Sequence, residues 1–337
     1  MPGDPNNPGF NRPIKSELKS KKIVFEEERP IRWSFMKYLR EHSNLKEFYP
    51  NISPYHEAYK VRDNTWAIYT DTFDGAGDPW MYLINGPKKA LLIDTGFGIG
   101  NLKGLVKKLI NDDDKEIIVA NTHYHFDHAY GNSQFDDIYI HEDGLYETKS
   151  IMNEHIWDYL YDHQTRKGIY TEFDVDDIVG YKEYNLHLLK DNECLDLGGN
   201  YLVEAIPLRG HAVGQCGYLD RVSHCLFTGD TGSISNRFVK DEVKQENATV
   251  ERLRDDYRKI VNRIEEVGGV FPGHGAFDLT PVVLKYSLDA LEKIVKDPKC
   301  YDEVKEFIDK QGNIKRQYIK YVYQGTSIKY SDENIFK

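Results

Sequence analysis

The first half of the chain repeats short apolar runs that are separated by turn residues. Runs of strand length, bounded by glycine, proline and asparagine, lie at residues 65–70, 80–84, 89–93 and 116–120. Residues 100–110 change to a helical period, with apolar side chains at Leu102, Leu105, Val106 and Leu109. The pattern therefore predicts three strands, a helix and a further strand.

The second half follows the same order after a long interruption. Apolar runs at residues 201–206, 217–219 and 225–228 predict strands, and residues 249–267 have one apolar helical face. A short segment follows, which begins at Phe271 and ends at His274. Strand runs followed by single helices, twice over, predict two mixed sheets with helices on the outside.

Changes in composition divide the chain. We predict an N-terminal arm and capping segment at 1–57 and a main domain at 58–300. Within that domain, residues 142–190 are rich in tyrosine and acidic residues, which indicates inserted helices and loops. Residues 301–337 are predicted to form a C-terminal extension with a helix near 301–311 and then edge strands.

Charge and hydropathy narrow the function classes. The chain has 337 residues and a formal net charge of −11, which disfavours nucleic acid as a partner. It has no apolar run long enough to cross a membrane and no apolar leader at its start. The four cysteines show no paired spacing, so we expect reduced thiols in a cytoplasmic protein that does not bind membranes.

The motif after residue 120 points to chemistry. His123, His125, Asp127 and His128 lie within six residues, directly after a predicted buried strand. Imidazole nitrogens and carboxylate oxygens are the usual ligands of zinc and related divalent ions. We expect His123 and His125 to face one ion, because alternate side chains of an extended loop point the same way. Asp127 and His128 are better placed for a second ion.

Further ligands must come from elsewhere in the chain. His211, Asp230 and His274 each follow an apolar run and stand next to a glycine, which allows a sharp turn and leaves space for an ion. Asp94 also lies between an apolar run and a glycine, and we expect it to hold a metal-binding histidine in the correct tautomer.

The order of these residues resembles that of the metallo-β-lactamase-fold hydrolases, including their lactonase and glyoxalase II-like branches. The resemblance covers roughly residues 60–295. It implies an α+β fold, a four-layer αββα sandwich with the metals at one edge of two sheets. The residues that carry it are, in order, Asp94, His123, His125, Asp127, His128, His211, Asp230 and His274.

The resemblance also implies a binuclear site. One ion would bind His123, His125 and His211. The second would bind Asp127, His128 and His274, with Asp230 as the bridge. Zinc is the expected metal, although iron and manganese occur in this superfamily.

Such a site indicates a hydrolase. A hydroxide that bridges two ions would cleave an ester, lactone or thioester of a small molecule, and Asp127 would accept the proton of the attacking water. β-Lactam or phosphodiester hydrolysis is an alternative on the same site. A different class, a sulfur dioxygenase-like oxidoreductase with a single iron, uses a reduced ligand set.

Individual positions distinguish some branches. His125 stands where the flavodiiron branch has glutamate, and Gln215 stands where glyoxalase II-like enzymes usually have a second histidine. Lactonases of the family often use a tyrosine at the carbonyl oxygen, which the sequence does not identify. The insert at 142–190 is either a lid over the metals or a dimerisation surface, so the sequence leaves open whether the protein is a homodimer.

Overall fold

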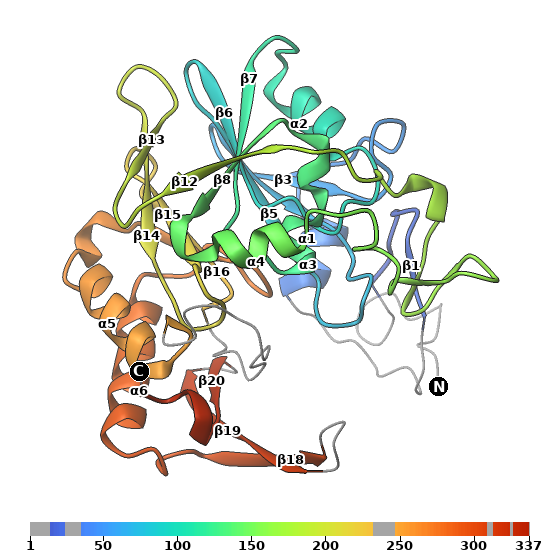
Figure 1. Ribbon diagram of the computed structural model, residues 1–337. Helices are drawn as coiled ribbons and strands as arrows, with labels where there is room; N and C mark the ends of the chain where they lie inside the picture. Colours follow the sequence, from blue (N-terminus) through green and yellow to red (C-terminus); the bar gives the residue numbers. More distant parts are fainter. Residues whose placement is uncertain (1–13, 24–34, 232–246, 309–312, 324–325, 337) are drawn as a thin grey trace.

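The computed structural model describes residues 14–23, 35–231, 247–308, 313–323 and 326–336 (Figure 1). The remaining residues lie outside this description, among them Trp33 of the predicted capping segment and Gly312, where the predicted C-terminal helix was expected to end. Within the described residues, no helix combines the length and the hydrophobicity that a membrane crossing requires.

The larger sheet has eight strands in the order β12-β8-β7-β6-β5-β4-β3-β2. Strands β12, β8, β7 and β6 are mutually parallel, whereas the neighbours from β6 to β2 are antiparallel. The ends of β6 and β7 therefore lie at the same edge of the sheet. The strands are β2 (Lys46–Glu47), β3 (Glu57–Arg62), β4 (Thr65–Tyr69), β5 (Trp80–Asn85), β6 (Lys89–Ile93), β7 (Glu116–Ala120), β8 (Asp137–His141) and β12 (Asn185–Leu189).

The smaller sheet has five strands in the order β13-β14-β15-β16-β17. Only its last pair, β16 and β17, is parallel, so these two strands also end at one edge. The strands are β13 (Cys194–Asp196), β14 (Leu202–Pro207), β15 (Cys216–Asp220), β16 (Cys225–Gly229) and β17 (Gly269–Pro272).

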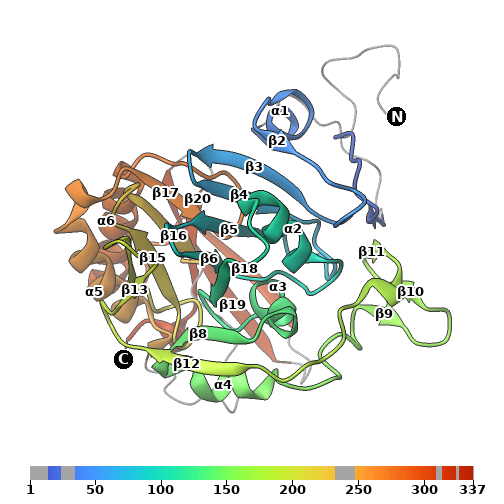
Figure 2. The same ribbon diagram turned by 90° about the horizontal axis from the view of Figure 1, so that it is seen from above.

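The two sheets pack face to face, with helices on both outer faces (Figure 2). In β5, Tyr82 and Ile84 point into the core between the sheets, whereas Met81 and Leu83 point to the layer that contains α2 (Leu102–Ile110). This alternation is the period of a strand that is buried on both faces.

On the opposite outer face, α5 and α6 cover the smaller sheet (Figure 2). Helix α5 (Val250–Val261) and helix α6 (Val282–Lys296) bury apolar side chains against β14, β15, β16 and β17. Helix α5 is shorter than the helix expected over 249–267, and a 3-10 turn at Ile264–Glu266 follows it. Helices, sheet, sheet and helices form the αββα sandwich predicted from the sequence.

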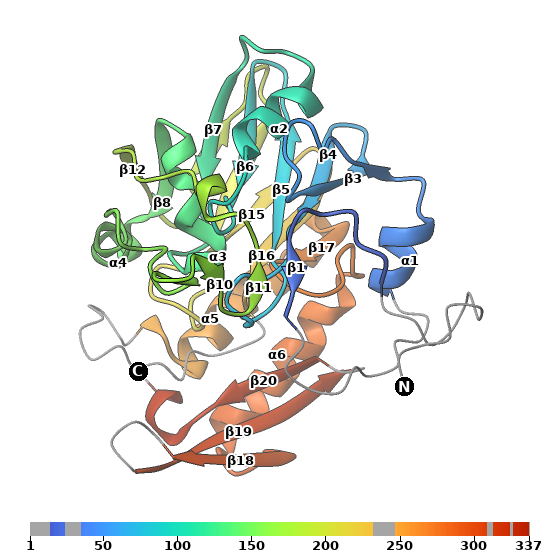
Figure 3. The same cartoon turned by 90° about the vertical axis from the view of Figure 1, so that its right-hand side faces the viewer.

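The C-terminal extension differs from the prediction. The segment expected to be a helix near 301–311 is a strand, β18 (Glu303–Ile308), paired antiparallel with β19 (Ile314–Tyr323). With β20 (Thr326–Tyr330) it forms a separate three-stranded sheet that packs on α6, rather than adding edge strands to the main sheets (Figures 1 and 3). Pairing with β19 satisfies its backbone, and this tertiary contact overrides the weak local preference of a polar segment.

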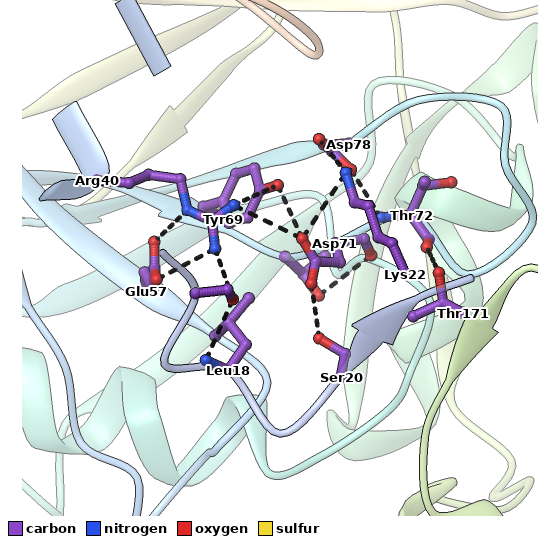
Figure 4. Close-up of polar contacts among 12 residues, drawn as sticks. Leu18, Ser20, Lys22, Arg40, Glu57, Tyr69, Asp71, Thr72, Asp78 and Thr171 are labelled. Carbon is purple, nitrogen blue, oxygen red and sulfur yellow. Dashed lines mark hydrogen bonds and ion pairs between the residues drawn. The ribbon is translucent and has the colours of Figure 1, made fainter. Parts of the chain in front are cut away.

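The N-terminal segment is fixed to the domain by buried charges (Figure 4). Helix α1 (Phe35–His42) carries Arg40, whose guanidinium pairs with Glu57 at 2.8 Å. A short strand, β1 (Lys21–Lys22), pairs with β11 (Thr171–Glu172) of the insert. Next to it, Ser20 donates to Asp71 at 2.8 Å.

The insert contains little regular structure, and its last part belongs to the large sheet. Helix α4 (Leu145–Ser150) is followed by the two-stranded pair β9 (Tyr161–Asp162) and β10 (Lys167–Gly168). Trp157 is buried and donates to the Phe97 carbonyl at 2.8 Å, so the insert packs on the turn after β6. Residues 185–189, predicted as part of the insert, form β12 instead.

Candidate metal centre

The ends of parallel strands converge at one edge of the sandwich. The motif that begins after β7 provides His123 and His125, and the short helix α3 (Phe126–Ala129) continues it. Asp94 follows β6, and Asp230 follows β16 in the facing sheet. His211 comes from the loop after β14, and His274 from the loop after β17. The structure thus brings all eight predicted site residues to one place.

The first group contains three histidines. Nδ1 of His125 lies 3.0 Å from Nε2 of His123 and 3.0 Å from Nε2 of His211. Donor atoms around a tetrahedral zinc ion are separated by roughly 3.3 Å, given Zn–N distances of about 2.0–2.1 Å. The three imidazoles are therefore spaced as ligands of one ion would be.

The second group adds carboxylates. Nε2 of His274 lies 3.1 Å from Oδ2 of Asp127, and Nε2 of His128 lies 3.6 Å from the same oxygen. These three residues form a further set whose donor atoms are close enough to share an ion.

Asp230 faces both groups. Its Oδ2 lies 3.1 Å from Nε2 of His274 and 3.7 Å from Nε2 of His211, and its Oδ1 lies 3.4 Å from Nε2 of His128. Nε2 of His128 and Oδ1 of Asp230 are buried and lack hydrogen-bond partners. Because buried polar atoms are normally satisfied, this pair fits a site that holds a cation.

Asp94 organises the histidines from behind. Its Oδ2 accepts from Nδ1 of His128 at 2.8 Å and from the Thr122 hydroxyl at 2.8 Å. The Thr122 oxygen in turn accepts from Nδ1 of His123 at 3.0 Å. Asp94 therefore directs Nε2 of both histidines into the site. Thr122 was not predicted from the sequence, because a threonine beside a histidine carries no distinctive signal.

His274 is oriented by the opposite loop. Its Nδ1 donates to the Asp78 carbonyl at 2.9 Å, which directs Nε2 to the carboxylates. The Asp78 side chain pairs with Lys22 at 2.6 Å (Figure 4), so the N-terminal segment supports this loop. This support cannot be predicted from the sequence alone, because residues 22, 78 and 274 are far apart in the chain.

Two glycines allow the loops to approach one another. A Cβ atom on Gly273 would lie 2.5 Å from Oδ1 of Asp230 and 2.8 Å from Cε1 of His128. Gly229 has φ of 53°, and a Cβ atom there would lie 2.8 Å from the Thr122 side chain. Both positions therefore require glycine for the site to form.

The two groups of candidate ligands differ in how burial and neighbouring charges shift the pKa of their histidines. Burial, together with the neighbouring His211, lowers the pKa of His125 to about 3, so this imidazole is neutral at physiological pH. Burial alone would also lower the pKa of His274, but the carboxylates of Asp230 and Asp127 outweigh it and raise the pKa to about 10. The carboxylate side of the site thus stabilises positive charge, as a cation-binding site must.

Another buried cluster lies beside the His211 loop. Arg209 is 2% exposed and makes ion pairs with Asp143, Asp191 and Asp256. His141 hydrogen-bonds Asp191 at 2.9 Å and is outside the groups of described residues able to hold an ion. These charges fix the loop that carries His211, because the Arg209 amide also donates to Asp256.

Comparison with known proteins agrees with this arrangement. The sequence model of the metallo-beta-lactamase superfamily matches residues 74–299 of the chain. The chain belongs to the metallo-beta-lactamase superfamily. This membership confirms the resemblance and the fold predicted from the sequence.

Individual members of the superfamily are distant in sequence. The acyl-coenzyme A thioesterase MBLAC2 of Bos taurus is 25% identical over 206 residues, which cover 58% of this chain and 72% of the relative. The Homo sapiens protein of the same name has the same identity and coverage. A solved metallo-beta-lactamase from Pontibacter korlensis aligns with a TM-score of 0.49 and 15% identity, over 70% of this chain and 99% of that one.

Proposed function

We propose that the protein is a metal-dependent hydrolase that cleaves the thioester bond of a small-molecule thioester in the cytoplasm. Two divalent ions would be held by the residues of the candidate metal centre, and zinc fits this histidine-rich donor set best. The four cysteines are unpaired, which supports a reducing compartment.

The position of Asp230 carries the proposal. Its two oxygens face histidines of both groups, at 3.4 Å from His128 and 3.7 Å from His211. A carboxylate in this position can bridge two ions, whereas a mononuclear iron site needs fewer ligands. The complete set supports hydrolysis over the sulfur dioxygenase-like alternative.

The two ions and Asp127 would have different roles in the reaction. When bound, the two ions would lower the pKa of a water molecule and polarise the substrate carbonyl. Asp127 is the group we assign to accept the proton at Oδ2. Burial raises its pKa, but His128 and His274 outweigh that effect and lower it, so the carboxylate is ionised at neutral pH.

The relatives favour a thioester among the bonds that such a site can cleave. Acyl-coenzyme A thioesterases from two vertebrates match more than half of the chain. Sequence identity of 25% does not transfer a substrate, so lactones, β-lactams and phosphodiesters belong in the same test.

The test is a substrate panel on protein stripped of metal with a chelator and reloaded with zinc, manganese or iron. We expect the protein to hydrolyse acetyl- and butanoyl-coenzyme A, which is measured as release of the free thiol. This activity should be lost in the stripped protein and restored by zinc. Asp230→Ala should lose it, whereas His155→Ala, at a histidine whose side chain is 72% exposed, should keep it. Thioesterase activity that survives chelation, or greater activity on another member of the panel, would overturn the proposal.

A further inference from the structure

A cavity of about 590 Å³ opens directly onto the candidate metal centre. His211, Asp230 and His274 form its inner end. From there it extends between α5, α6 and the C-terminal sheet, which lie together in the lower part of the molecule in two perpendicular views (Figures 1 and 3). Its volume is within the roughly 300–1,000 Å³ of small-molecule sites.

The walls of this cavity are mainly apolar. Val270, Leu279, Val283 and Leu284 contribute aliphatic side chains. Tyr257 is buried, and its hydroxyl donates to Thr231 at 3.0 Å, so its ring is the part that is left for contact. An apolar group that leaves water would therefore be stabilised along most of the cavity.

The described lining residues include no lysine or arginine, and Asp230 brings a carboxylate. Phosphate groups are usually bound by cationic side chains or by aligned backbone amides. The described lining therefore offers no cationic side chain to a phosphate-bearing carrier such as coenzyme A. The acyl half of a thioester suits this cavity, because its carbonyl must reach the metal centre while its hydrocarbon chain needs an apolar environment.

The C-terminal sheet forms the outer part of the wall. Tyr323, at the end of β19, and Thr326, at the start of β20, line the cavity. Tyr286 of α6 stacks on Tyr323 with ring centroids 5.5 Å apart, and Ile328 is buried in the α5–α6 core. This wall is fixed to the domain, and it lies beyond residue 299, where the superfamily match ends.

We propose that this cavity binds the hydrocarbon chain of the substrate's acyl group, and that α6 and the C-terminal sheet set the chain length that the enzyme accepts. The proposal rests on the proposed thioesterase function and specifies its substrate class as thioesters of medium or long apolar acyl groups. None of the described residues that line the cavity belongs to the insert at 142–190, for which the sequence leaves open a lid or a dimerisation surface.

Burial of hydrocarbon sets the size of the effect. Each methylene that leaves water raises kcat/KM by up to about fourfold, the factor that corresponds to ~0.8 kcal/mol. We therefore expect kcat/KM of the wild-type enzyme to increase at least tenfold from butanoyl- to decanoyl-coenzyme A, and then to level off once the cavity is filled.

The direct test adds volume inside the cavity. Val283 lines it, whereas the neighbouring Val282 is 38% exposed and does not. Val283→Phe should lower the decanoyl-to-butanoyl ratio of kcat/KM at least tenfold. Val282→Phe makes the same change one residue away on the same helix turn, and it should leave that ratio unchanged. Equal ratios in the wild type and Val283→Phe, or an equal loss in both variants, would overturn the proposal.

A binding measurement separates this proposal from the thioesterase function. Titration calorimetry with decanoate and butanoate needs no turnover. We expect the wild type and Val282→Phe to bind decanoate at least tenfold more tightly than Val283→Phe does. If that pattern holds and no thioester is hydrolysed, the proposed function fails and the cavity assignment stands. If thioesters are hydrolysed with no dependence on chain length, the cavity assignment fails alone.

Discussion

Replacement of Asp94 by asparagine tests how the metal centre is organised. The carboxylate is 2% exposed and accepts three hydrogen bonds, from the Thr122 amide at 2.7 Å, the Thr122 hydroxyl and Nδ1 of His128. Asp94 has φ of 62°, a left-handed conformation that asparagine also tolerates. The substitution therefore removes charge and one acceptor oxygen and leaves the backbone unchanged.

The expected loss follows from these contacts. An amide nitrogen in place of Oδ2 would face two donors, so His128 and Thr122 would lose their shared acceptor. Removal of such a supporting group typically weakens metal affinity by about 10–100-fold, which is roughly 1.4–2.7 kcal/mol. An unsatisfied buried donor also lowers the free energy of unfolding by about 1–3 kcal/mol.

Zinc affinity, measured by competition with a chromophoric chelator, separates these two effects. Asp220→Asn is the matched control, because Asp220 is fully buried and accepts from Tyr201 and from the amide and hydroxyl of Ser223, all outside the metal centre. We expect it to lose stability and to keep its zinc affinity. Wild-type zinc affinity in Asp94→Asn, or an equal loss in both variants, would refute the reasoning.

Three further outcomes test other parts of the account. His123→Ala and Asp230→Ala should each reduce turnover to background and lower the metal content below two ions per chain, measured by elemental analysis. Glu57→Ala removes the closer carboxylate partner of the buried Arg40 and leaves it, among the described residues, only Asp71, at 3.7 Å. It should lower the free energy of unfolding in urea by about 3–5 kcal/mol; a loss below 1 kcal/mol would contradict this role. Burial lowers the pKa of His56 to about 3, so the unfolded chain binds its proton first as pH falls below 6.5. The free energy of unfolding should therefore be about 2 kcal/mol lower at pH 5 than at neutral pH because of this residue, and His56→Gln should abolish that difference.

The sandwich was predictable because its strands carry strong signals. Runs such as β5 and β6 are apolar on both faces, which only a strand between two layers requires. The convergence of Asp94, Asp230 and His274 was predictable as well, because each stands after an apolar run with a glycine one or two residues away. Which of these loops face one another was implied by the family resemblance and not by the apolar pattern.

The misses have physical causes. Residues 303–308 lie on an exposed surface, so their apolar residues follow neither the helical nor the strand period. Pairing with β19 therefore decides their structure. Apolar and polar side chains alternate only weakly over residues 185–189, and pairing with β8 determines their place at the edge of the large sheet. Support from Thr122 and from the Asp78 carbonyl depends on hydrogen bonds across loops, which leave no periodic trace in the sequence.

The most direct test of the central claim is anomalous diffraction from a crystal of the zinc-loaded protein, recorded on both sides of the zinc absorption edge. We expect two zinc peaks. One should lie among His123, His125 and His211, and the other among Asp127, His128 and His274, with Asp230 between them. A single peak, or zinc bound only away from these side chains, would contradict that claim.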